Sequence, residues 1–220
     1  MKKIILSITL LMSAMAGYCQ LIKPVKLDSL VTISLPPGYQ TKDTLNEHIF
    51  TANGMYGYMI AFREANAKNN TPLKTQSDLN KVMKTYIKGI QAQQPGSSAQ
   101  YVRDTTIGTL KAKTFTLKSD DGNGVITCRN FVLIYTQDVT YTIEYVYPAE
   151  RTDVVKPEYK AFIASIKLSP ELQRNDQYLS NATGMSSTTK IEVFGGAGLV
   201  VLVILVLIAV KTKKKEPALG

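Results

Sequence analysis

Cys128 and His48 are the two side chains that could provide a nucleophile and a general base, the pair that thiol-based acyl transfer needs. His48 is the only histidine of the chain. The residues around the cysteine, Ile126-Thr-Cys-Arg-Asn130, match neither a nucleophile elbow nor a cysteine-protease signature. We therefore expect no catalytic residues and no enzymatic activity. Cys128 is expected to be a small buried residue of a strand, or to pair with a cysteine of another chain.

Residues that could bind a metal ion or a cofactor are scarce. One histidine and two cysteines leave too few ligands for a zinc site of the usual kind. Residues 119–124, Ser-Asp-Asp-Gly-Asn-Gly, offer oxygen ligands as a calcium loop does, but they lack the spacing of an EF-hand. Their composition predicts a hairpin turn instead. No βαβ pattern accompanies the Gly-Asn-Gly, so a dinucleotide site is not indicated. We expect neither a metal nor a cofactor.

Tyrosines are the residues most open to a role in binding. The chain has 12 tyrosines and no tryptophan. Four of them gather in one predicted hairpin, namely Tyr135, Tyr141, Tyr145 and Tyr147. If these side chains are exposed, they would form a surface for a protein or glycan partner. If they lie beneath a helix, they fill the core between the sheet and its cover, and we favour this second interpretation.

Most of the chain after residue 30 has the alternating pattern that predicts strands. Residues 30–35 end at the turn Pro36-Pro37-Gly38. Residues 47–52 and 56–62 are expected to form a hairpin around Asn53-Gly54. Four more strands are expected at residues 99–106, 109–117, 125–136 and 139–147.

Two helices are predicted among these strands. Apolar residues recur at the helical period over residues 79–90, and Thr75 with Asp78 could cap the first turn. Pro95-Gly96 should end this helix. Pro157 suits the first turn of the second helix. The apolar residues of that helix are Tyr159, Phe162, Ile163 and Ile166.

The order of these elements resembles the PsbP-like superfamily, which is named for an extrinsic subunit of photosystem II and includes small exported bacterial proteins. The resembling stretches are residues 33–39 (Ile-Ser-Leu-Pro-Pro-Gly-Tyr), the helix around Tyr86, the hairpin over 124–147 and the ending over 162–168, so that residues 28–168 are covered. The resemblance implies an α+β fold, an α/β/α sandwich around a largely antiparallel sheet. It also implies a binding or assembly factor, since the superfamily supplies no catalytic motif.

Residues 1–19 have the layout of a secretory signal peptide, with two lysines, an apolar stretch and small residues after it. Cleavage is expected after Ala16 or after Cys19, which would leave residues 20–168 as an extracytoplasmic PsbP-like domain. Lipid attachment to Cys19 is an alternative that the bulky Tyr18 disfavours. An uncleaved anchor is another alternative, but the apolar stretch is short for a membrane span.

The other end of the chain predicts a membrane anchor. Residues 169–192 are polar, lack apolar periodicity and are expected to form a stalk. Residues 193–210 carry no charge and can just span a bilayer as one transmembrane helix. Residues 211–220 contain four lysines and are expected to stay in the cytoplasm. Gly195-Gly196 leaves open a sorting signal whose helix is later removed. Such an anchor departs from the soluble photosynthetic relatives and argues against a role in a photosystem.

The charge and the two ends together indicate a function class. The formal net charge is +9, but the two ends hold five of these charges, so the domain is only mildly basic and nucleic-acid binding is not indicated. We expect a single-pass membrane protein, in contact with lipid, whose extracytoplasmic domain is a binding or assembly module for an envelope protein. Alternatives are a structural or stress-related envelope protein, whose helix associates through its glycines, and a carrier of a small apolar ligand.

Overall fold

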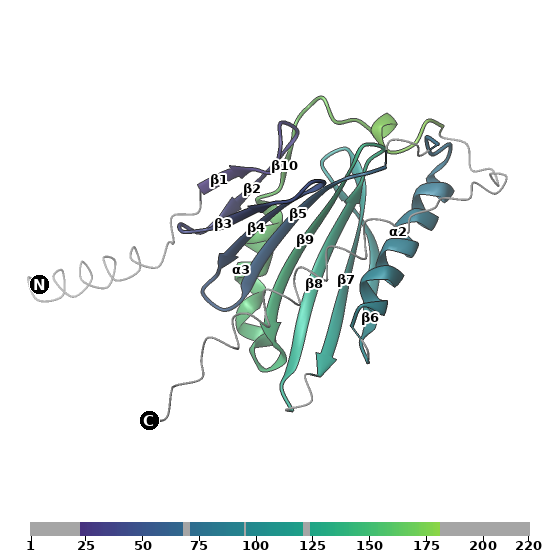
Figure 1. Ribbon diagram of the computed structural model, residues 1–220. Coiled ribbons are helices and arrows are strands. Elements are labelled where there is room, and N and C mark those ends of the chain that lie inside the picture. The colour runs from purple at the N-terminus through teal and green to yellow at the C-terminus, as the bar shows by residue number, and fades with distance from the viewer. Residues whose placement is uncertain (1–22, 68–70, 95, 121–123, 181–220) are drawn as a thin grey trace, which may run out of the picture.

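A seven-stranded antiparallel sheet is the main element of the computed structural model, which describes residues 23–67, 71–94, 96–120 and 124–180. Its strands are β3 (Gln40–Asp43), β4 (Glu47–Asn53), β5 (Tyr58–Ala65), β6 (Ser98–Ile107), β7 (Leu110–Asp120), β8 (Ile126–Tyr135) and β9 (Val139–Pro148). They lie in the order β3-β4-β5-β9-β8-β7-β6 (Figure 1). Strands β4 to β9 confirm the six strands predicted after residue 46. All four residues of β3 are exposed, so β3 has no apolar alternation by which it could be recognised.

A second, smaller sheet has three strands in the order β1-β2-β10. Its strands are β1 (Lys23–Lys26), β2 (Val31–Leu35) and β10 (Lys167–Leu168). The alternation of β2 is confirmed, because Val31, Ile33 and Leu35 are all fully buried. The sequence predicted neither β1 nor β10. Strand β1 buries one residue, and β10 is two residues long, so neither shows a period.

The first described helix, α2 (Gln76–Ala92), begins and ends as the sequence predicted. The backbone N–H of Asp78 donates to Thr75 Oγ1 (3.3 Å), and the backbone N–H of Thr75 donates to Asp78 Oδ2 (3.1 Å). These two bonds satisfy donors that the first turn of a helix otherwise leaves free. The buried apolar residues of α2 form one face, namely Leu79, Val82, Met83, Tyr86, Ile87 and Ile90.

The second helix, α3 (Thr152–Ala164), follows the short 3-10 turn η1 (Ala149–Arg151). The sequence placed Pro157 in the first turn, and this is wrong, since Pro157 lies inside the helix. The helix starts earlier because the chain passes from β9 through η1 directly into helical conformation. Pro157 lacks the N–H that would bond to the carbonyl of Asp153. Because Asp153 and Pro157 are both exposed, that carbonyl is not left buried without a donor.

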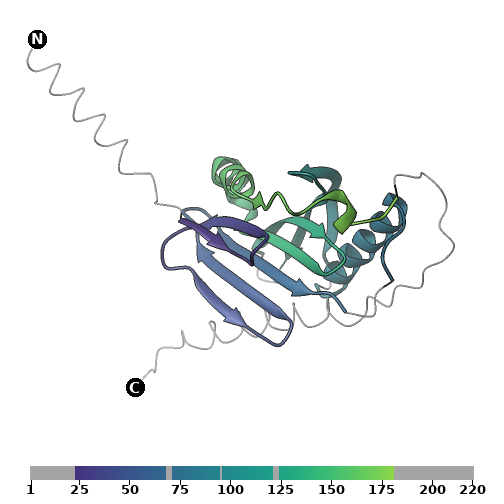
Figure 2. The same ribbon diagram turned by 90° about the horizontal axis from the view of Figure 1, so that it is seen from above.

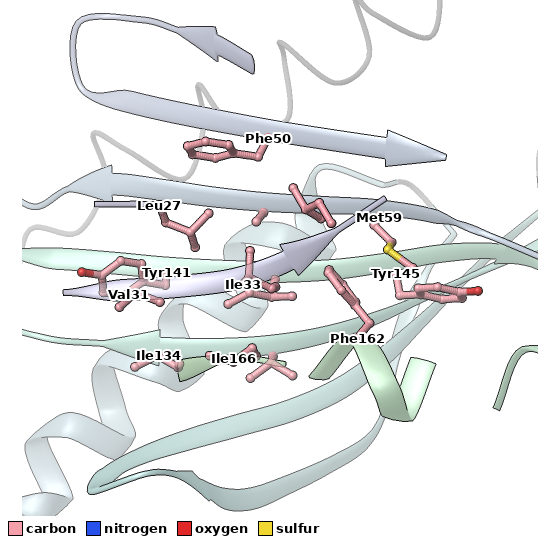
Figure 3. Packing of buried hydrophobic residues seen from close by; sticks show 14 of the residues in the cluster. Leu27, Val31, Ile33, Phe50, Met59, Ile134, Tyr141, Tyr145, Phe162 and Ile166 are labelled. Carbon is pink, nitrogen blue, oxygen red and sulfur yellow. The ribbon is translucent and has the colours of Figure 1, made fainter. Parts of the chain in front are cut away.

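The two helices cover opposite faces of the large sheet (Figure 2). Helix α2 packs on β7 and β8 around the stacked rings of Phe115 and Phe131. Helix α3 and strand β2 pack on the other face. Figure 3 shows Ile33 and Phe162 there, beside Met59. The expectation of a largely antiparallel, sheet-rich fold with two helices is therefore confirmed.

Residues 169–180 pack against the domain, although the sequence placed the start of the stalk at Ser169. Leu172 and Tyr178 are buried, and Gln177 is completely buried. The Gln177 amide accepts from the backbone N–H of Lys111 (2.7 Å) and donates to the carbonyls of Lys111 and Tyr135, both at 2.8 Å. The stalk boundary at Ser169 is thus wrong. A polar side chain attaches this segment, and a search for apolar periodicity does not detect such an attachment.

Several predictions concern residues outside those that the structure describes. They are the signal peptide over 1–19, the rest of the stalk over 181–192, the apolar run over 193–210 and the tail over 211–220. Within the described ranges, neither helix has the length and apolar character that crossing a membrane requires. The transmembrane helix and the signal peptide stay predictions.

Candidate functional site

The four tyrosines proposed as a partner surface are buried. Tyr141 and Tyr145 have no exposed area, and Tyr135 and Tyr147 are 3% and 6% exposed. Alternation along β9 places Tyr141, Tyr145 and Tyr147 on one face, in the core beneath α3 and β2, as Figure 3 shows for the first two. Tyr135 belongs to the opposite core, beneath α2. These side chains therefore form no partner surface; they pack in the core, which is the interpretation that we favoured from the sequence.

Tyr145 joins α3 to the turn between β4 and β5. Its hydroxyl donates to the Glu158 carboxylate, which also accepts from the backbone N–H groups of Met55 (2.6 Å) and Tyr56 (3.0 Å). Burial raises the pKa of Tyr145 well above its usual value, and the bond to Glu158 raises it further. The tyrosine stays neutral, and its role here is to hold a helix and a turn together.

Tyr141 has a similar role at the other end of the same strand. Its hydroxyl donates to Asp28 Oδ2 (2.6 Å), and the same oxygen accepts from Arg63 Nε (3.3 Å). Burial raises the pKa of Tyr141, and the bond to Asp28 adds to the effect. This cluster connects β5 and β9 to the loop before β2 and exposes no reactive group.

Cys128 and His48 lie far apart, on β8 and β4, with β5 and β9 between these strands. The strand registers put His48 in line with Ile134, about six residues along β8 from Cys128. This places the two residues about 14 Å apart across the sheet and about 20 Å apart along it. His48 Nδ1 lies 2.8 Å from Asp43 Oδ1, and Cys128 is buried. The structure does not bring them together as a catalytic pair.

The segment that offered calcium ligands is only partly described. Ser119 and Asp120 continue β7 and pair with β8, while residues 121–123 lie outside the described ranges. Among the residues that the structure describes, no three histidine, cysteine, aspartate or glutamate side chains gather closely enough to hold a metal ion.

A cavity of about 240 Å³ lies between α2 and the β6–β7 hairpin. Its polar lining comes from both sides, with Gln76, Asn80, Asp104, Thr105, Thr106 and Lys111. The Asp104 carboxylate is held by the buried Lys113 ammonium from the facing position on β7. A carrier of an apolar ligand needs a deep apolar cavity, and this one is small and largely polar.

Two buried carboxyl groups lie opposite each other on β4 and β5. Glu47 and Glu64 are direct cross-strand partners and are 4% and 6% exposed. The pKa of Glu64 is raised to about 7, chiefly by burial and also by the charge of Glu47, while a hydrogen bond from Tyr86 acts in the opposite direction. Burial also raises the pKa of Glu47. Paired carboxyls act in hydrolysis only where a substrate reaches them, and at these exposures the pair is structural.

The β4–β5 turn, the start of β8 and the start of α3 lie at one end of the molecule (the lower end in Figure 1), and each carries exposed apolar side chains. They are Met55, Tyr56, Val125, Ile126 and Val154, each 39–51% exposed. We call this set the apolar end. Sequence reasoning missed it because the residues come from three separate segments. The available signal was the presence of large apolar residues in and beside turns.

Contacts tie the three segments of the apolar end together. Glu158 of α3 holds the backbone of Met55 and Tyr56, and Val154 lies one helical turn before Glu158, on the same side of α3. Thr127, which follows Ile126, pairs with Pro148 of β9, and η1 lies against β8. The three segments are therefore held on one fixed frame.

No protein-family model and no curated protein matches the sequence. Similar solved structures include cyanobacterial PsbP from Synechocystis sp. PCC 6803, with 13% identity, a TM-score of 0.48, and coverage of 67% of this chain and 92% of that one. LpqN of Mycobacterium tuberculosis, involved in cell envelope biogenesis, has 11% identity, a TM-score of 0.45, and coverage of 70% and 88%. A Pseudomonas aeruginosa protein of unknown function has 14% identity, a TM-score of 0.44, and coverage of 68% and 98%. Similarities of this size carry no argument about function, and the PsbP-like resemblance stays a prediction.

Proposed function

We propose that this chain is a non-enzymatic binding or assembly module that is tethered to a membrane through residues 193–210 and holds a protein partner at the outer face. The observation that carries the proposal is the apolar end. Large apolar side chains gathered on one rigid surface are typical of a protein-interaction site. The turn and helix that present them are fixed by Glu158, so binding would not require the surface to reorganise.

The position of the apolar end agrees with a tether at the other end of the domain. The backbone N–H of Ser180, the last described residue, donates to the carbonyl of Lys74, just before α2. Gln76 at the start of α2 and Lys111 at the start of β7 line the same cavity. Strand β7 runs from there to Asp120, which pairs with Ile126 of the apolar end. A chain that continues from residue 180 into a membrane would leave the apolar end facing away from the lipid.

A triple variant tests the proposal in intact cells that express the tagged full chain. Met55→Ser, Val125→Ser and Val154→Ser remove three exposed apolar side chains and no buried group. After crosslinking and pull-down, we expect one discrete partner band that the triple variant reduces at least tenfold, since each side chain contributes about 1 kcal/mol when it is buried against a partner.

Leu45→Ser is the matched control. Leu45 is fully exposed in the turn between β3 and β4, at the opposite end of the sheet. The control should retain the partner band. Equal loss in the control and the triple variant, or no discrete band with the wild-type chain, would contradict the proposal.

A further inference from the structure

The cavity of about 240 Å³ between α2 and the β6–β7 hairpin has one wall from the helix and one from the sheet, which lie side by side in Figure 1. Gln76, Asn80 and Met83 share one side of α2, because they follow each other at intervals of four and three residues. Met83 and Ala112 are only 1% and 2% exposed. The cavity therefore has an apolar bottom, and the two carboxamide side chains lie nearer its opening.

The sheet wall of the cavity is polar. Asp104 pairs with Lys113, and Thr106 pairs with Lys111, across β6 and β7. Cross-strand partners lie on the same face of a sheet, and so do residues two apart on one strand. This face is the one that α2 covers, because Phe115, two residues after Lys113, packs in the core beneath α2. The four polar side chains therefore lie on the helix side of the sheet.

The charges of this wall leave an excess of one positive charge. The buried Lys113 ammonium neutralises the Asp104 carboxylate and bonds to its Oδ1 atom. Oδ2 of the same carboxylate can still accept a hydrogen bond. Lys111 is exposed, and within the described residues it forms no ion pair. Its ammonium is a group that an anionic ligand could bind.

The uncharged lining favours a ligand with several hydroxyl groups. The side chains of Gln76, Asn80 and Thr106 can each donate and accept hydrogen bonds, and none of the three bonds to another side chain or backbone group of the described residues. Hydroxyl groups also donate and accept, so they are complementary to such a lining. Pockets for drug-sized ligands have volumes of roughly 300–1,000 Å³, and this smaller cavity suits a molecule of monosaccharide size.

Residues 177–180 hold both walls of the cavity in place. The Gln177 amide bonds to the backbone of Lys111 at 2.7 and 2.8 Å. The backbone N–H of Ser180 donates to the carbonyl of Lys74 at 2.8 Å, just before α2 begins. The cavity is therefore formed before a ligand enters, which lowers the entropic cost of binding.

We propose that this cavity binds a sugar acid of monosaccharide size, such as a hexuronate. Lys111 binds the carboxylate of the ligand. The Gln76 and Asn80 amides and Asp104 Oδ2 bond to its hydroxyl groups, and Met83 contacts the C–H groups of its ring. The cavity is separate from the apolar end, and neither proposal depends on the other.

The test is an NMR titration of the isotope-labelled full chain in micelles of a polyoxyethylene detergent, which carries no sugar. The probes are D-glucuronate and D-galacturonate, each compared with its neutral counterpart, D-glucose or D-galactose. The members of each pair differ only at the carboxylate. We expect at least one acid to shift the side-chain amide signals of Gln76 and Asn80. That acid should bind about tenfold more tightly than its neutral counterpart, as for a hydrogen bond to a charged group.

Two variants separate the charge from the rest of the lining. Lys111→Gln should lower the affinity for the acid about tenfold and leave that for the neutral sugar unchanged, so the preference disappears. Asn80→Ala should weaken the binding of both sugars alike, so the preference remains. Neither residue is buried, and thermal unfolding would check that both variants fold.

Lys118→Gln is the matched control. Lys118 is an exposed lysine of the same strand, and its cross-strand partner Cys128 belongs to the core on the other face of the sheet. This variant should keep the affinity and the preference of the wild-type chain. Equal binding of an acid and its neutral counterpart, a preference that survives Lys111→Gln or is lost in Lys118→Gln, or no binding of any of the four sugars would overturn the proposal.

Discussion

Glu64 and Glu47 place two carboxyl groups opposite each other where β4 and β5 pair, and no lysine, arginine or histidine of the described residues forms an ion pair with either. Burial and the neighbouring charge both favour the protonated form of Glu64, so its pKa is about 7 in the folded protein. In the unfolded chain the value returns to about 4.5. Folding is therefore coupled to the binding of a proton by the Glu64 carboxylate.

The sign of the coupling gives a prediction. Between about pH 4.5 and pH 7 the folded state holds a proton that the unfolded state has lost, so stability that is present below pH 4.5 is lost as the pH rises toward 7. The loss is about 3 kcal/mol. Glu64→Gln should remove most of this dependence, whereas Glu171→Gln, at an exposed position, should keep it. Urea unfolding at a series of pH values measures the effect, and an unchanged slope in Glu64→Gln would contradict it.

At the residue scale, alternation along a strand predicted the direction of the side chains but does not by itself show which face of the sheet is covered. Alternation correctly places Tyr141, Tyr145 and Tyr147 on one face of β9. It cannot tell which face a helix covers, because that depends on β2 and α3, which are distant in sequence. The partners that receive the tyrosine hydroxyls, Asp28 and Glu158, are far away in sequence for the same reason.

At the element scale, periodicity predicted the strands and helices long enough to show it. The alternation of β4 to β9 and the apolar face of α2 each extend over several residues, so local patterns were sufficient. Strands β3 and β10 are too exposed or too short to show a period. Residues 169–180 were missed for a different reason, since Gln177 attaches them by hydrogen bonds to β7 and β8.

Gln177 is therefore expected to determine where the folded domain ends. Gln177→Leu removes three hydrogen bonds from a fully buried side chain to the backbone of Lys111 and Tyr135. The free energy of unfolding should fall by about 2–4 kcal/mol. Amide hydrogen exchange in residues 172–180 should become faster. Glu171→Leu is the control, because Glu171 is exposed in the same segment. Equal stability of the two variants would show that Gln177 does not hold the segment.

The turn between β4 and β5 gives a second prediction at the scale of the elements. A Cβ atom on Gly57 would lie 2.6 Å from the Tyr145 ring, and the bond to Glu158 prevents that ring from moving away. Gly57→Ala should therefore lower the free energy of unfolding by about 1–3 kcal/mol. The comparison is Gly57→Ala in a Tyr145→Leu background, where the ring is absent and the cost of the alanine should be much smaller. Thermal unfolding of the four proteins gives this coupling directly.

At the scale of the whole molecule, the proposed function depends on which end of the domain leads to residues 193–210. The last described residues lie beside the start of α2, and the apolar end lies at the far ends of β7 and β9. If residues 193–210 lie in lipid, a partner would meet the domain at the surface farthest from the membrane. The sequence predicts the tether at one end of this arrangement. It does not indicate the apolar end, because the residues of that end come from three segments that only the folded chain brings together.

Charged substitutions within residues 193–210 test the proposed tether. Residues 193–210 contain no charged side chain, and a lysine near the middle of a membrane span costs roughly 3 kcal/mol. Replacing Leu202 and Leu205 together by lysine should release most of the full chain from membranes on carbonate extraction, whereas the wild-type chain stays in the pellet. Lys213→Gln, outside the apolar run, should behave as the wild type does. If the wild-type chain is itself extracted by carbonate, residues 193–210 are no tether, and the apolar end would then have to find its partner without being held at a membrane.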